Sequence, residues 1–179
     1  MGVVCAVVAD DNVIQVDKVA RIDLARCLHS RVPASLCTLY HSNATCDRVA
    51  HFLQEWDPWL TKAHAVLIER QPPGGFKDVE ALLQHCLRDK VHVIQPQSVH
   101  AHFGLPQGDY DRRKELTVAL ASPYMLGVAG WGGLERKHDV ADAMCQLLWW
   151  LSKQPRKRKI PEERNEFWTY AFDSTDLKK

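Results

Sequence analysis

Apolar positions along the chain follow two spacings, and each spacing predicts a different kind of element. Short β-prone apolar runs bounded by turn residues predict strands at about residues 2–9, 13–24, 65–69 and 91–94. Apolar residues three and four positions apart predict helices at about 45–56, 77–88, 110–121 and 138–153, with a helix or turn at about 98–103. Loops are expected at 25–42 and 122–135, and Pro58 should end or kink the helix before it.

The order of these elements predicts the fold class. Two strands come first, and a helix, a strand, a helix, a strand and further helices follow, which is typical of an α/β protein. We expect a mixed sheet flanked by helices, opening with a hairpin whose turn is Asp10-Asp11-Asn12. A chain of 179 residues fits one domain, 1–152, followed by a tail, 153–179, that is first basic and then acidic.

Composition narrows the function classes. With 46% hydrophobic and 25% charged residues the chain has the composition of a globular domain, without a secretory leader or an apolar run that could span a bilayer. We therefore expect an intracellular protein with no membrane partner. The net charge is only +1, but Arg112-Arg113-Lys114 and a run from Lys153 to Lys159 concentrate positive charge, which favours contact with phosphates.

Three carboxylates suggest a chemistry. Glu69 ends the apolar run 65–68, and Asp139 and Asp142 stand three residues apart at the start of the last helix, which puts them on one helix face. Brought together, they would form an oxygen-rich site for two hard divalent cations. Taken singly, a solvated strand end and the helix dipole explain the same residues. His100 and His102 are only a weak indication of metal binding, because two histidines can easily stand close together by chance in a chain that has nine.

Three segments resemble a known family. They are Val-Leu-Ile-Glu-Arg-Gln at 66–71, Val-His-Val-Ile-Gln-Pro at 91–96 and Lys-His-Asp-Val-Ala-Asp-Ala at 137–143. Together they resemble the RuvC-like Holliday junction resolvases, above all the poxvirus and iridovirus type, over about residues 2–151. The resemblance implies a ribonuclease H-like fold and a homodimeric endonuclease that resolves four-way DNA junctions in recombination, repair and replication. It also implies a viral protein acting in the nucleus or cytoplasmic factory of an infected cell.

The resemblance further implies a site of four acids that holds two Mg²⁺ ions, for which Mn²⁺ can substitute. Carried over by position, Glu69, Asp139 and Asp142 are the catalytic and metal-binding residues. The first acid of the family stands in an Asp-x-Gly pattern on the opening strand, and no such pattern precedes the predicted hairpin. One explanation is that the acid-bearing strand is missing, because the chain is truncated, starts at a misassigned codon or has lost it. The other is that the first apolar run is itself the opening strand and Asp10 or Asp11 supplies the acid.

The resemblance implies that Arg112, Arg113 and Lys114 contact junction phosphates, and a solvated helix face is the alternative. Lys137 and His138 could orient water or contact the scissile phosphate, or could simply be exposed flanking charges. The candidate DNA-binding residues are Arg70, Arg112, Arg113, Lys114, Lys137 and His138. Two other functions remain open: a catalytically incomplete protein that only binds junctions, and a ribonuclease H-like nuclease acting on RNA–DNA hybrids or flaps.

Overall fold

A computed structural model describes residues 1–9, 13–22, 24 and 44–154. Its strands are β1 (Gly2–Val8), β2 (Ile14–Arg21), β3 (Val66–Glu69) and β4 (Val91–Ile94). Its α-helices are α1 (Thr45–Leu60), α2 (Lys77–Leu87), α3 (Pro96–Phe103), α4 (Tyr110–Ala121) and α5 (Lys137–Lys153). Two short 3₁₀ helices, η2 (Arg88–Lys90) and η3 (Ser122–Met125), follow α2 and α4. The predicted α/β class and element order are confirmed, whereas the predicted loop 25–42 and turn 10–12 lie outside the described residues.

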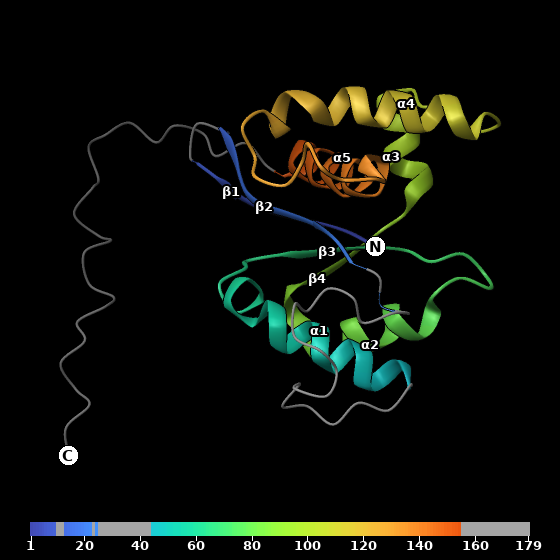
Figure 1. Cartoon of the computed structure of the whole chain (residues 1–179). Helices are drawn as coiled ribbons and strands as arrows, with labels where there is room; N and C mark the ends of the chain where they lie inside the picture. The colour runs from blue at the N-terminus through green and yellow to red at the C-terminus, as the bar shows by residue number, and fades with distance from the viewer. Residues whose placement is uncertain (10–12, 23, 25–43, 155–179) are drawn as a thin grey trace, which may run out of the picture.

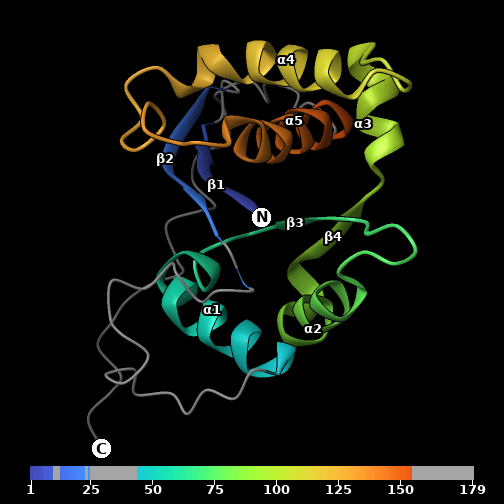
Figure 2. The same cartoon turned by 45° about the vertical axis from the view of Figure 1, so that its right-hand side comes forward.

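The elements form three layers. In both views the strands lie between α3, α4 and α5 on one side and α1 and α2 on the other (Figures 1 and 2). Within the described part of the chain, no helix is long and apolar enough to cross a membrane.

The strands pair in two separate sheets. β1 and β2 are antiparallel, from Gly2 opposite Arg21 to Val8 opposite Ile14, which agrees with the predicted hairpin. β3 and β4 are parallel, with Glu69 opposite Ile94. The prediction of one mixed sheet is wrong for the described residues, because neither strand of the first pair is hydrogen-bonded to a strand of the second. β1 and β3 each have a single strand partner, and most of their residues are only half-buried.

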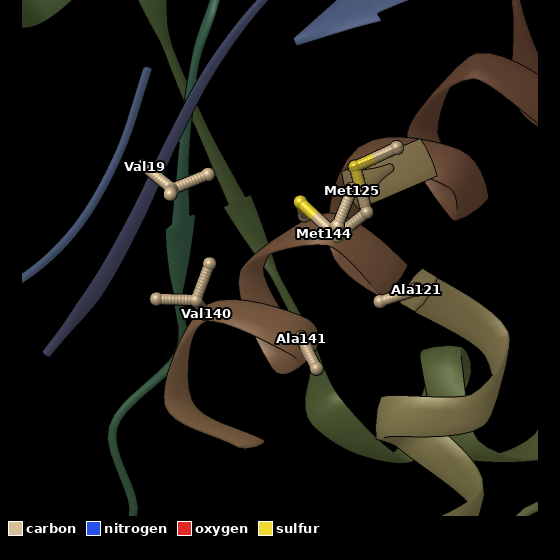
Figure 3. Packing of buried hydrophobic residues seen from close by; sticks show 6 residues of the cluster. All are labelled: Val19, Ala121, Met125, Val140, Ala141 and Met144. Atoms are coloured by element: carbon tan, nitrogen blue, oxygen red, sulfur yellow. The ribbon is translucent and has the colours of Figure 1, made fainter. Parts of the chain in front are cut away.

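The strands contribute to cores on both faces because successive side chains of a strand point in opposite directions. Val4 packs towards the core cluster beneath α5, and its neighbours Val3 and Cys5 pack towards α1 and α2. Figure 3 shows the buried residues of the first cluster, which are Val19, Ala121, Met125, Val140, Ala141 and Met144. The buried residues of the second are Ile22, Val49, Phe52, Trp56, Val79 and Leu83.

Two sequence-based boundaries change. Helix α1 does not stop at Pro58 but continues to Leu60. Its last turn is held by packing, since Trp59 and Leu60 both join the α1–α2 core cluster and Lys18 Nζ lies 3.6 Å from the centroid of the Trp59 ring. The predicted loop 122–135 begins with the helix η3, which the buried side chain of Met125 anchors in the core cluster beneath α5.

Gly2 permits a close approach of α5 to β1. A Cβ built on Gly2 would collide with the backbone carbonyl of Asp139, in the first turn of α5. The nearest atoms that this Cβ would meet are all backbone atoms of α5, so no side chain could rotate away to make room. A glycine at this position therefore determines how near the start of α5 lies to the sheet.

We expect Gly2→Ala to lower the free energy of unfolding by about 1–3 kcal/mol, the usual cost of forcing extra atoms into a packed interior. Urea denaturation followed by circular dichroism measures this. Gly133→Ala is the matched control, because a Cβ at Gly133 meets nothing within 4 Å, and its effect should stay within about 0.5 kcal/mol. Equal unfolding midpoints for the two variants would contradict the close approach.

Candidate active site

Two of the three predicted acids meet in one pocket. Glu69 is the last residue of β3 and Asp142 lies in the second turn of α5, and both line a pocket formed with α3 and α4. The parallel partner β4 runs directly into α3, so the ends of β3 and β4 open towards the same pocket. The strand end and helix face that sequence reasoning joined are therefore adjacent in the fold.

Gln146 fixes the orientation of Glu69. Its Nε2 donates a hydrogen bond of 2.8 Å to Glu69 Oε2, and the Gln146 residue is only 7% exposed. Gln146 stands one turn after Asp142, so the two side chains share a face of α5. Sequence reasoning missed Gln146, although this spacing of four could have indicated it.

Lys114 brings a positive charge into the pocket, next to Arg113, which also lines it. Its Nζ lies 2.5 Å from Asp142 Oδ2, and the Lys114 side chain is 19% exposed. Lys114 was predicted to contact DNA from a basic cluster. In the structure its ammonium group pairs with one of the predicted metal ligands.

The pKa of Glu69 is raised above its ordinary value of 4.5. Burial is the main cause, and the negative charge of Asp142 adds to it. The ammonium of Lys114 and the hydrogen bond from Gln146 act in the opposite direction without cancelling the rise. The pocket therefore holds a carboxylate whose ionised form is disfavoured, as expected where a cation has to be bound.

Asp139 does not line the pocket. Its Oδ2 lies 3.3 Å from Arg21 Nε and 3.3 Å from Arg136 Nε, and its Oδ1 is 3.3 Å from His138 Nε2. Although Asp139 and Asp142 are three residues apart, one faces β2 and the other faces α4. The structure thus brings Glu69 and Asp142 together and holds Asp139 between arginines.

Glu69 and Asp142 fit a hard divalent cation. Carboxylate oxygens are the ligands that Mg²⁺ prefers, and Mg²⁺ is often bound by one or two carboxylates together with several waters. Asp142 already pairs with one cationic group in the pocket, the ammonium of Lys114. Among the described residues, no group of three or more His, Cys, Asp or Glu side chains is placed to hold a metal ion.

His100 also lines the pocket. Burial lowers its pKa, and the nearby charges of Arg113 and Lys114 lower it further, against the effect of Asp142. The imidazole is therefore neutral at pH 7. His102 is not in the lining, and its ring lies edge-on to Phe103.

The other predicted DNA-binding residues on α4 have separate roles. Arg113 Nη1 donates to the carbonyl oxygens of Pro106 and Gln107 and so ties down the connection between α3 and α4. Arg112 is exposed and pairs with Glu115 on the same helix at 3.0 Å. Arg113 nevertheless lines the pocket together with Lys114, whereas Arg112 is not part of the lining.

The predicted DNA-binding residues at the start of α5 lie beside Asp139. Lys137 Nζ lies 5.8 Å from the ring centroid of Trp131, and the His138 side chain is 25% exposed. Burial and the charges of Lys114 and Arg136 lower the pKa of His138, against the opposing effect of Asp139 and Asp142. Lys137 and His138 thus lie at the start of α5 and do not line the pocket.

Glu80, which sequence reasoning did not single out, fastens the loop that follows Glu69. This buried α2 residue accepts a 2.7 Å hydrogen bond from the backbone N–H of Gln71, and Arg70 and Lys77 pair with it at 3.6 and 3.4 Å. Burial alone would raise the pKa of Glu80, but the Gln71 hydrogen bond and these two cations bring it below its ordinary value. Arg70, a predicted DNA contact, is therefore held towards α2 by its ion pair with Glu80.

No protein-family model matches the chain, and no curated protein or solved structure is similar to it.

We expect Glu69→Gln to be at least as stable as the natural protein at neutral pH. Because the pKa of Glu69 is raised on folding, its stability contribution is greatest while it is protonated and falls as the pH rises above 4.5. Glutamine mimics the protonated form and can still accept the hydrogen bond from Gln146. The advantage of the variant should therefore grow with pH, as measured by urea unfolding between about pH 4 and 8.

Glu115→Gln is the control for this titration, because the Glu115 side chain is 68% exposed and belongs to a surface pair. It should show no such growing advantage. A Glu69→Gln protein that is less stable than the natural protein at every pH would contradict the assignment of an unfavourable buried charge.

Proposed function

We propose that the protein is a magnesium-dependent endonuclease that acts on branched DNA. The observation that carries the proposal is the meeting of Glu69 and Asp142, from a strand end and a helix, in a pocket that also contains basic side chains. An acidic pair beside Lys114 and Arg113 suits a phosphodiester, which needs a cation at the scissile group and positive charge along the flanking phosphates.

We also propose a ribonuclease H-like fold. The three-layer arrangement supports it, as does the position of the two acids on a strand of the middle layer and on a helix that packs over that layer. β1 and β3 each leave one edge without a strand partner among the described residues. These edges are consistent with the expectation that an acid-bearing strand belongs to the sheet.

Each residue of the pocket would have its own role in the reaction. Glu69 and Asp142 would hold Mg²⁺, and Gln146 keeps the Glu69 carboxylate in its orientation. When bound, Mg²⁺ supplies an activated water and stabilises the leaving oxygen. Lys114 and the neutral His100 stand beside the carboxylates, where a phosphate oxygen would accept their hydrogen bonds. A homodimer would place two such sites about a two-fold axis, which symmetric cleavage of a four-way junction requires.

A catalytically incomplete junction-binding protein is the second candidate. The observation that favours it is the position of Asp139, whose carboxylate is occupied by Arg21 and Arg136 and does not line the pocket. Two carboxylates in the pocket support one cation better than two.

We expect a labelled synthetic four-way junction to be nicked in paired, symmetric positions when Mg²⁺ is present. Glu69→Gln should lower the cleavage rate by at least about a hundredfold, since it removes a metal ligand, while junction binding in a gel-shift assay should persist. Glu115→Gln, which neutralises an exposed glutamate away from the pocket, should cut like the natural protein.

The outcomes separate the two candidates. Tight junction binding without nicks from any of the three proteins would favour the incomplete protein. Absence of binding to any branched DNA, in low salt where backbone contacts are strongest, would refute both.

A further inference from the structure

Lys114 is placed where a metal ion would be expected. Its Nζ contacts Asp142 Oδ2, and it lines the same pocket as Glu69. Lys114 enters the pocket from α4, whereas the two carboxylates come from β3 and α5. The ammonium therefore pairs α4 with α5 directly, and it shares a pocket with the end of β3.

The positive charge matters because the two carboxylates oppose each other. The charge of Asp142 raises the pKa of Glu69 and the charge of Lys114 lowers it. The ring of Tyr110, one turn earlier on α4, lies with its centroid 5.3 Å from Lys114 Nζ and offers the ammonium a second favourable contact. If the ammonium leaves Asp142, it can therefore keep a favourable contact with Tyr110 on the same helix.

We propose that Lys114 is a resident counter-ion of the site, and that a divalent cation binds by displacing its ammonium from Asp142. This inference rests on the proposed function, because it takes Glu69 and Asp142 as the metal ligands. Displacement has two consequences: metal affinity is lower than the carboxylates alone would give, and the released ammonium becomes available to a phosphate oxygen.

Replacing Lys114 by a neutral residue tests the first consequence, the lowered metal affinity. In Lys114→Met the carboxylates lose their only contacting ammonium within the described residues, so the metal-free protein should melt at a lower temperature. No ion pair then has to break when the metal enters. The affinity for the metal should therefore rise.

The test is a titration with Mn²⁺, in which the electron paramagnetic resonance signal of the free ion reports binding directly. We expect Lys114→Met to bind Mn²⁺ about tenfold more tightly than the natural protein, as removal of a contacting like charge implies. Lys114→Arg keeps the positive charge and should therefore bind Mn²⁺ more weakly than Lys114→Met. Arg112→Met removes a positive charge from the same helix, but from a surface pair, and should leave the affinity unchanged.

Lys114→Gln serves as a second neutral variant that can still donate a hydrogen bond to Asp142, in case the methionine variant does not fold. Affinities that are unchanged or weaker in the neutral variants would overturn the displacement, provided that Glu69→Gln abolishes binding to the natural site. Absence of Mn²⁺ binding in every protein, Lys114→Met included, would overturn both this inference and the metal-dependent function.

Discussion

The packing of α5 against β1 is the constraint on which the rest of the structure depends. The contact at Gly2 determines the depth at which the helix starts, and Val140, Ala141 and Met144 then fill the core beneath it without exposed surface. Because α5 is seated in this way, Asp142 and Gln146 project towards the end of β3. A helix placed farther from β1 would separate these side chains from Glu69.

Much of the fold is predictable because local signals were strong. Apolar runs located all four described strands, and helical spacings located four of the five α-helices, since burial of one face leaves a periodic trace in the sequence. The segment of α3 was predicted only as a helix or turn. The extension of α1 past Pro58 was not predictable, because it depends on packing of Trp59 and Leu60 against distant residues. The split into two sheets was also hidden, since apolar runs reveal strands but not their partners.

The site was predictable only in part for a similar reason. Spacing predicted that Asp139 and Asp142 share one face of α5, but it does not reveal which residues lie opposite each side chain. Arg21 of β2 meets one and Lys114 of α4 meets the other, and both partners come from distant parts of the chain. Lys114 looked like one member of a basic cluster because its two neighbours are also basic, although the helix turns the three side chains in different directions.

The division of the strands into two pairs has a mechanical consequence for the pocket. Glu69 belongs to the β3–β4 pair, whereas Asp142 is carried by α5, which rests on β1 and β2. In the described residues no backbone ladder joins these pairs, so the spacing between the two carboxylates is maintained by apolar contacts and by the bond from Gln146. Side-chain contacts of this kind slide more easily than a hydrogen-bonded ladder. The pocket therefore lies across a seam that no backbone ladder bridges in the described residues, where a small shear between the two strand pairs would change the distance between its charges.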